Sequence, residues 1–166
     1  MTNLNQLLLN FEHKQNFKDE DFYVSKSNYF AFNLVNTWPK WEKNFLNICG
    51  DNFSGKSHLT NIFLKKFKGI KINAHLFKNK NLQEIKVYQN VILENFDQNI
   101  DEVLIYSLFN TIDHDNKYLI INSTTPINEI NFKLDDLKSR TKNCLFAKIE
   151  KPDDELMFAL ILKNFS

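Results

Sequence analysis

The residues best suited to chemistry form an eight-residue pattern, G-x-x-x-x-G-K-S, that runs from Gly50 to Ser57. In such a loop, backbone N–H groups surround phosphate oxygens, and the positive end of the following helix strengthens their attraction. We expect Lys56 to reach the β- and γ-phosphates of ATP or ADP, and the Ser57 hydroxyl to bind Mg²⁺. A chance Gly-Lys turn is the alternative, which the flanking apolar strand and amphipathic helix disfavour. The predicted nucleotide-binding residues here are Gly50, Asp51, Asn52, Phe53, Ser54, Gly55, Lys56, Ser57 and His58.

An acidic residue follows the apolar run of residues 91–93. Phosphoryl transfer needs a carboxylate near Mg²⁺ and usually a second group that orients water. Glu94 is the predicted metal ligand, although it could simply end a strand that faces solvent. Asn95 stands where the second carboxylate is expected, and Asp97 lies two residues further on, off the strand end in this register. The pattern therefore favours nucleotide binding over hydrolysis, with weak or no intrinsic ATPase activity.

Arg140 is the only arginine among the 21 basic residues. A planar guanidinium binds phosphate with two parallel hydrogen bonds, which lysine reproduces poorly. We expect Arg140 to act as an arginine finger on a nucleotide held by a neighbouring subunit; an ordinary surface arginine is the alternative. Asn122, at the end of a predicted strand, is a candidate for sensing the γ-phosphate or holding the water. Its alternative role is a turn residue before Pro126.

Apolar periodicity places these groups on alternating strands and helices. We expect strands at residues 45–49, 70–72, 91–93, 118–121 and 145–149, and helices at 28–36, 56–67, 101–111, 135–141 and 153–165. Gly69 is predicted to end the second of these helices. This alternation indicates an α/β fold in which a five-stranded parallel sheet lies between two helical layers. The expected class is a three-layer P-loop NTPase.

The bulk composition fits one globular domain of 166 residues with a formal charge of +1. Such a balanced charge gives no electrostatic basis for wrapping nucleic acid. Cys49 and Cys144 form no disulfide framework or metal cluster, and no apolar run is long enough to cross a membrane. These features predict a cytoplasmic protein with an N-terminal tail at residues 1–20 and a nucleotide-binding domain at residues 21–166.

Three long stretches carry a resemblance to a known family: FYVSKSNYFAFNLVNTWPKWEKNFLNICGDNFSGKSHL, DEVLIYSLFNTIDHDNKYLIINSTTP and LDDLKSRTKNCLFAKIEKPDDELMFALILKNF. Together they resemble the AAA+ domain of the DnaA/Hda family of bacterial replication-initiation proteins. The resemblance implies that Phe22, Tyr23, Val24 and Asn28 lie near the adenine, and it supports Arg140 as the finger. The family's helical lid, which bears a second nucleotide-sensing arginine, is expected to be absent or truncated here.

The segment QLLLNF, residues 6–11, is similar to the clamp-binding hexapeptide of the Hda branch, with Gln6, Leu9 and Phe11 as anchors. An apolar tail that packs on its own domain is the alternative. Nothing that resembles the helix-turn-helix domain of DnaA follows residue 166, so we expect no direct sequence-specific DNA binding. The resemblance thus favours an Hda-like negative regulator of replication initiation. Its expected partners are DnaA and the DNA polymerase sliding clamp, with a homo-oligomer left open.

Two other functions stay open on the sequence. The first is a DnaA-related adaptor or loader, or a DnaA AAA+ fragment, that binds nucleotide and recruits replication partners without stimulating hydrolysis. The second is a self-sufficient ATPase, which the pairing of Glu94 with Asn95 disfavours.

Overall fold

A computed structural model describes residues 22–164 of the chain. The tail motif with Gln6, Leu9 and Phe11 therefore lies outside the described residues. Within this part, five strands form one parallel sheet in the order β2-β3-β4-β1-β5. The strands are β1 (Phe45–Cys49), β2 (Gly69–Asn73), β3 (Asn90–Phe96), β4 (Tyr118–Ser123) and β5 (Leu145–Lys148). This confirms the predicted five-stranded parallel α/β fold.

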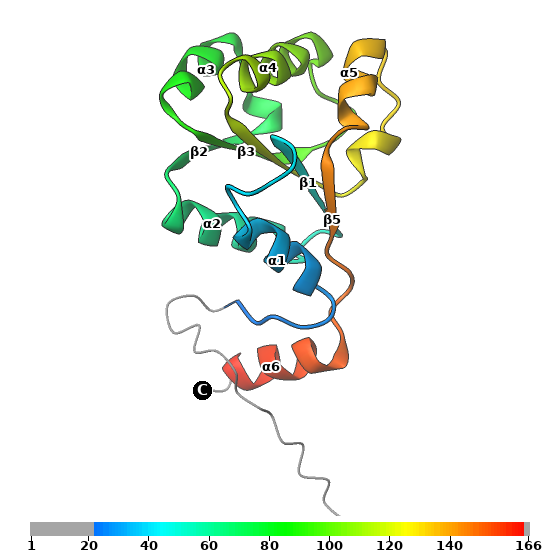
Figure 1. The fold of residues 1–166 in the computed structure, drawn as a ribbon. Coiled ribbons are helices and arrows are strands. Elements are labelled where there is room, and N and C mark those ends of the chain that lie inside the picture. Colours follow the sequence, from blue (N-terminus) through cyan, green and yellow to red (C-terminus); the bar gives the residue numbers. More distant parts are fainter. Residues whose placement is uncertain (1–21, 165–166) are drawn as a thin grey trace, which may run out of the picture.

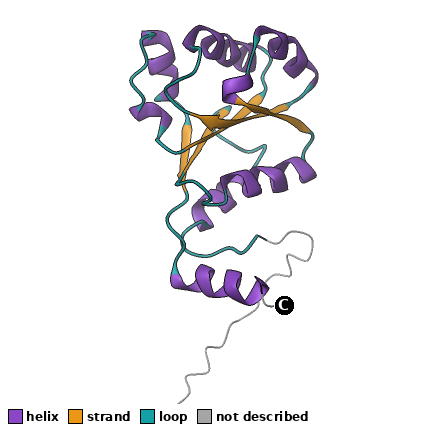
Figure 2. Ribbon diagram, turned by 180° about the vertical axis from the view of Figure 1, so that it is seen from behind, coloured by secondary structure: helices purple, strands orange, loops and turns teal. Residues whose placement is uncertain are grey.

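Helices cover both faces of the sheet and make a three-layer domain (Figures 1 and 2). The helices α1 and α2 lie on one face, and α3, α4 and α5 lie on the other (Figure 1). The α-helices are α1 (Tyr29–Asn36), α2 (Lys56–Lys66), α3 (Asn79–Glu84), α4 (Glu102–His114), α5 (Asp135–Thr141) and α6 (Asp154–Asn164). Single-turn 3₁₀ segments occur at η1 (Ala74–Leu76), η2 (Ile85–Val87) and η3 (Ile127–Glu129).

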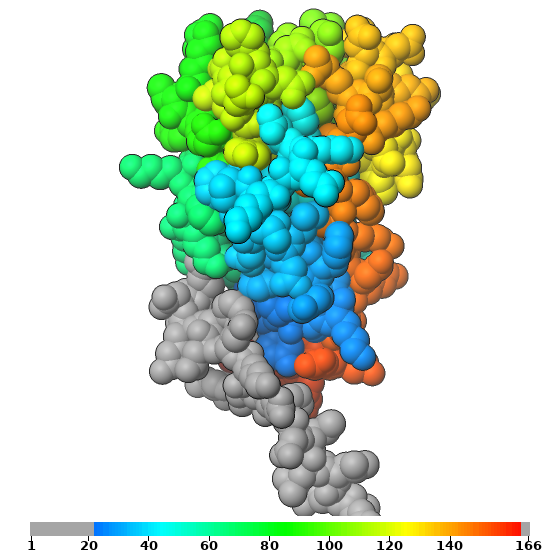
Figure 3. Space-filling view, viewed as in Figure 1, coloured from blue at the N-terminus to red at the C-terminus, as the bar shows by residue number. Residues whose placement is uncertain are grey.

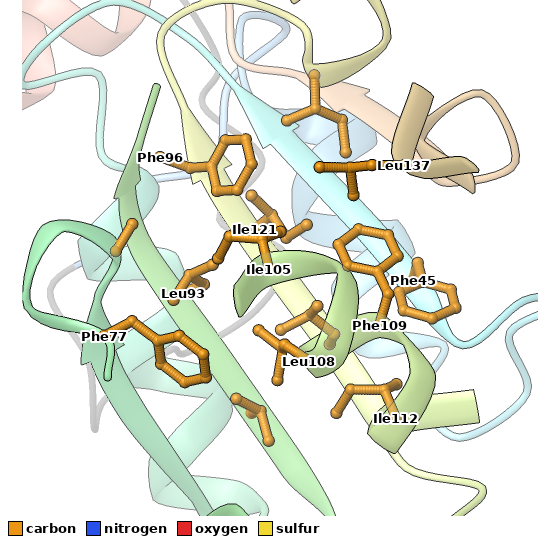
Figure 4. Close-up of a cluster of buried hydrophobic side chains, with 14 of the residues drawn as sticks. Phe45, Phe77, Leu93, Phe96, Ile105, Leu108, Phe109, Ile112, Ile121 and Leu137 are labelled. Carbon is orange, nitrogen blue, oxygen red and sulfur yellow. The ribbon is translucent and has the colours of Figure 1, made fainter. Parts of the chain in front are cut away.

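The strands are apolar on both faces because each face is covered by helices. On the α4 side, Phe45 stacks on Phe109 with ring centroids 4.6 Å apart, in a cluster that also contains Leu93 and Ile121 (Figure 4). On the α2 side, alternate residues of the same strands pack against Phe63. The central strands are therefore packed between two apolar cores, one under each helical layer.

The helix α1 lies alongside the edge strand β5, as the blue and orange surfaces show in Figure 3. The segment before α1 is held to the start of α6: the Tyr23 hydroxyl donates to Glu155 over 3.0 Å, and the Ser27 amide donates to Asp153 over 3.2 Å. No helix within residues 22–164 has the length and apolarity to cross a membrane.

Two local expectations were wrong. Gly69 does not end a helix: α2 stops at Lys66, and Gly69 opens β2. A side chain at Gly69 would place its Cβ 2.6 Å from the Asn90 carbonyl, so glycine is required for the close approach of β2 to β3. The third strand also extends past residue 93 to Phe96, through an irregularity of strand register around Asn95. The short helix α3 had not been expected, because its six residues carry no clear apolar period.

Candidate nucleotide-binding site

The predicted phosphate loop connects the central strand β1 to the N-terminus of α2. Gly50 is crowded, because a Cβ there would lie 2.8 Å from the Ile149 carbonyl oxygen. Gly55 has a left-handed φ of +97° and caps α2, a conformation that glycine adopts without strain. The two glycines of the motif therefore stand where the chain cannot accommodate a side chain or where it must turn sharply. Phe53 also has a positive φ, of 63°, although it is not glycine.

The Lys56 ammonium lies over this loop. It donates to the Gly50 carbonyl over 2.6 Å, to the Asp51 carbonyl over 2.7 Å and to the Ser54 hydroxyl over 3.4 Å. Burial lowers the pKa of Lys56 from its ordinary value, against the opposing effect of nearby negative charges. Phosphate oxygens are acceptors of the same kind as these carbonyls, so the ammonium is positioned to hold phosphate at the loop.

Glu94 is the shared partner of the polar side chains beside the loop. Its carboxylate accepts hydrogen bonds from the Ser57 hydroxyl over 2.8 Å, and from the Thr60 hydroxyl and the Asn122 amide, both over 3.0 Å. Lys71 forms an ion pair with it over 3.1 Å. Burial alone would raise the pKa of Glu94, but hydrogen bonds from Ser57 and Asn122 and the charge of Lys71 lower it overall. The structure thus brings together Ser57, Glu94 and Asn122, three predicted site residues from α2, β3 and β4.

A pocket of about 770 Å³ opens in front of these groups. Its lining includes most of the predicted loop: Asn52, Phe53, Ser54, Gly55, Lys56, Ser57 and His58, together with Glu94 and Asn122. Gly50 and Asp51 line a second pocket of about 660 Å³ on the β5 side of the loop. This placement at the carboxyl ends of parallel strands is where open α/β sheets bind their ligands.

Asp97 also lines the larger pocket, which the sequence interpretation had not foreseen. Asn95 has a left-handed φ of 56°, and the pairing of β3 with β4 shifts by one residue between Leu93 and Phe96. After this irregularity, Asp97 reaches the pocket rim and pairs with His75 over 3.1 Å. A carboxylate is therefore present at the pocket rim in addition to the Asn95 amide.

Ser57 and Glu94 offer oxygen atoms that suit Mg²⁺ as ligands. A hydroxyl and a carboxylate are ligands that Mg²⁺ accepts, with phosphate oxygens and waters completing six positions. Within residues 22–164 no cluster of three His, Cys, Asp or Glu side chains forms a metal site, so Ser57 and Glu94 would need those additional ligands. The Asn122 Oδ1 is buried, and none of the described residues donates a hydrogen bond to it.

The residues expected near the adenine lie beside the loop, in the segment before α1. Phe22 packs edge-to-face on His58 with ring centroids 5.3 Å apart. Asn28 is buried and uses both ends of its amide on the backbone, donating to the Tyr23 carbonyl over 2.9 Å and accepting from the Ser25 amide over 3.0 Å. Asn28 therefore shapes this segment, and Val24 lies half-buried within it. Neither residue lines the larger pocket.

Arg140 lies near the amino-terminal ends of the strands, whereas the phosphate loop lies at their carboxyl-terminal ends. It belongs to α5, just before the start of β5, and it lines a pocket of about 700 Å³ with Phe45, the first residue of β1. Its guanidinium pairs with Asp113 and lies 5.5 Å from the centre of the Tyr106 ring. Since the loop follows the last residue of β1, the structure does not bring Arg140 to its own phosphate site.

Two contributors to the site had been missed. Thr60 lies one helical turn after Ser57, a spacing that puts both hydroxyls on one face of α2. Lys71 is a lone charge between two isoleucines in a short strand, and that interruption of an apolar run was the available signal. Neither residue could be assigned to Glu94 without knowing that β2 pairs with β3.

The fold and the loop define a P-loop NTPase domain of the AAA+ type. Over this domain the chain is similar in sequence to DnaA proteins. It is 26% identical over 177 residues to the chromosomal replication initiator protein DnaA of Borreliella afzelii, which covers 91% of this chain and 36% of that protein. It is 29% identical over 171 residues to DnaA of Thermoanaerobacter sp., covering 87% of this chain and 39% of that protein. The chain thus spans less than two-fifths of the length of these relatives.

Solved structures give the same fold. A DNA replication initiation factor superposes with a TM-score of 0.74 and 22% identity, over 87% of this chain and 52% of that one. AMPPCP-bound DnaA from Aquifex aeolicus superposes with a TM-score of 0.72 and 21% identity, over 90% of this chain and 55% of that one. Domain III of Thermotoga maritima DnaA superposes with a TM-score of 0.66 and 20% identity, over 87% of this chain and 73% of that one. No protein-family model matches the chain.

Proposed function

We propose that this protein regulates chromosomal replication initiation by promoting hydrolysis of ATP that is bound to DnaA. The observation that carries the proposal is the position of Arg140 near the amino-terminal ends of the strands, opposite to the end that bears the protein's own phosphate loop. An arginine in that position cannot serve its own nucleotide, but it can face the nucleotide of an adjacent AAA+ subunit. The homology to DnaA supports DnaA as that neighbour.

The protein's own site is proposed to bind ATP or ADP as a regulatory ligand. The related DnaA of Aquifex aeolicus is AMPPCP-bound in its structure, which supports an adenine nucleotide here. Lys56 would hold the phosphates, and Ser57 with Glu94 would hold Mg²⁺, which neutralises phosphate charge when it is bound. Asn95 cannot accept a proton from water, so we expect slow intrinsic hydrolysis.

The action of Arg140 follows from its chemistry. A guanidinium presents a rigid fork of donors, and a finger supplied in trans stabilises the charge that develops on the transferred phosphoryl group. The side chain is 32% exposed, and its pairing with Asp113 and contact with Tyr106 orient it at the surface. We propose that docking on DnaA brings this oriented group to the γ-phosphate of DnaA's ATP.

Residues 1–20 are proposed to be a tail that docks the protein on the sliding clamp through Gln6, Leu9 and Phe11. The support is the likeness of QLLLNF to a clamp-binding peptide, in which a glutamine and apolar side chains enter a groove as an extended segment. Residues 21–166 are proposed to be the nucleotide-binding domain.

The proposal is tested by mixing the full chain with clamp-loaded DNA and ATP-bound DnaA and following phosphate release. The Arg140→Ala variant is expected to lose stimulation on the order of a thousandfold, the size of effect that arginine fingers have elsewhere. Lys138→Ala removes an exposed positive charge from the same helix and serves as the matched control. Equal stimulation by Arg140→Ala and the parent protein would overturn the proposal.

A second candidate is an adaptor that recruits replication partners without stimulating hydrolysis. It draws on the fold shared with DnaI, which superposes with a TM-score of 0.59 and 13% identity over 81% of this chain and 87% of that one. Retention on immobilised clamp separates the two functions. Retention that is lost in the Gln6→Ala, Leu9→Ala double variant supports the clamp-dependent regulator, whereas no retention of the parent protein supports the adaptor.

A further inference from the structure

A lysine on β2 holds the carboxylate that is expected to bind Mg²⁺. Lys71 pairs in register with Ile92 of β3, and Glu94 follows two residues later on the same face of that strand. The two side chains are therefore diagonal neighbours on the α2 face of the sheet. The distance from Lys71 Nζ to Glu94 Oε1 is 3.1 Å.

The Lys71 ammonium has as many oxygen partners as it has N–H groups. Besides Glu94, it donates to the Ser57 carbonyl over 3.4 Å and to the Asn61 side-chain oxygen. An ammonium has three donors and no acceptor, so these three oxygens satisfy it completely. Its side chain is 27% exposed, so the charge lies beside the site and is only partly withdrawn from solvent.

Lys71 also satisfies the charge of Glu94. The carboxylate is buried, with a side chain that is only 10% exposed, and an uncompensated anion there would be costly. In many nucleotide sites that compensation comes from the divalent ion itself. Here the compensating cation belongs to the chain, and it contacts the backbone of Ser57, the residue whose hydroxyl would be the other protein ligand of the ion.

We propose that Lys71 is a resident cation that takes over the electrostatic role of Mg²⁺ at the Ser57–Glu94 pair. Nucleotide would then bind to this protein with little dependence on Mg²⁺. A divalent ion held by Ser57 and Glu94 would share the carboxylate with Lys71, so it would add little to the affinity for nucleotide. The inference rests on the proposed binding of nucleotide at this loop, and it assigns Lys71 a positioning and charge-balancing role.

The test compares the affinity for ADP in excess MgCl₂ with the affinity in EDTA, measured by titration calorimetry on the full chain. The parent protein is expected to show a ratio of affinities within about threefold, whereas Lys71→Met is expected to raise that ratio to about tenfold or more. Methionine keeps the length of the side chain and removes the charge. Lys71→Arg, which retains the charge, is expected to behave as the parent does.

Lys68→Met is the matched control, because Lys68 is an exposed lysine three residues earlier in the chain. Thermal unfolding of each variant without nucleotide shows whether it is folded. If Lys71→Met binds ADP with the same Mg²⁺ ratio as the parent, the inference is wrong while nucleotide binding stands. A parent protein that already binds ADP about tenfold more tightly with Mg²⁺ also overturns it. If the folded parent binds no ADP in either buffer, both the inference and the proposed nucleotide site fall.

Discussion

The Ser57 hydroxyl donates a 2.8 Å hydrogen bond to Glu94 Oε2, which joins the first turn of α2 to the end of β3. This contact crosses β4, because β4 separates β3 from the loop-bearing strand β1 in the sheet. The amide of Asn122, from β4, meets the same carboxylate. The buried carboxylate of Glu94 thus joins α2, β3 and β4 at the pocket.

Removing the Thr60 hydroxyl is expected to destabilise the fold through this anion. Thr60→Val keeps the side-chain shape and deletes a 3.0 Å hydrogen bond to Glu94. We expect a loss of about 1–3 kcal/mol in the free energy of unfolding, since hydrogen bonds to charged, buried groups are the stronger ones. Urea denaturation measures it. Thr111→Val is the control, because that hydroxyl donates only to the Ser107 carbonyl within α4; an equal loss in both variants would contradict the prediction.

Acidification is expected to weaken the fold through Glu94. The pKa of Glu94 is lowered below its ordinary value of 4.5, so this group contributes stability that is complete above the unfolded-state pKa. That contribution is lost as the pH falls through the lower, folded-state pKa. Urea midpoints measured from about pH 6 down to about pH 3 should fall less steeply in Glu94→Gln than in the parent. Parallel slopes would show that Glu94 is not a source of the acid sensitivity.

Replacing Phe53 with glycine is expected to stabilise the protein. Phe53 holds a φ of 63° with its side chain fully exposed, so the backbone strain is not offset by burial. Glycine relieves a penalty of about 1–2 kcal/mol but gains freedom in the unfolded chain, for a net stabilisation of about 0.5–1 kcal/mol. Phe53→Ala retains a Cβ and should not gain this stability, which makes it the matched control. Thermal unfolding distinguishes the two variants, and an equal shift in both would remove strain as the explanation.

The thiol of Cys144 is expected to resist alkylation in the folded protein. Burial raises the pKa of Cys144 to about 12, and the reactive thiolate is therefore scarce at neutral and mildly alkaline pH. Burial also raises the pKa of Cys49. Iodoacetamide at about pH 8 should modify neither cysteine without denaturant and both in concentrated urea, as mass spectrometry of the intact chain would show. Rapid modification of Cys144 in the native protein would contradict this.

Local patterns were sufficient to indicate the parts of the candidate site that are continuous in sequence. The loop from Gly50 to Ser57 depends on backbone geometry within a few residues, and its strand–loop–helix setting is visible in the apolar runs on either side. Glu94 was found in the same way, because it is the first charged residue after the apolar run of residues 91–93. The parallel sheet followed from the alternation of strands with helices.

The remaining features depend on contacts between distant segments. The role of Lys71 exists only because β2 pairs with β3 in one register, and that register is set by packing rather than by any nearby residue. Asp97 reaches the pocket because of an irregularity at Asn95, which a regular two-residue alternation cannot anticipate. Gly69 was misread for a similar reason: the Asn90 carbonyl that excludes its side chain lies on another strand.

The separation of Arg140 from the phosphate loop gives the domain a direction. A surface that offers its finger at one edge and its phosphate loop at the other is suited to a heterologous, head-to-tail contact, in which different patches of the two partners meet. In such a contact the finger of one molecule meets the loop of the next, and one finger and one loop are left unused at the two ends. In the proposed complex with DnaA, one molecule must therefore lead and the other follow, and the order of the two cannot be reversed without losing the arginine from the reaction.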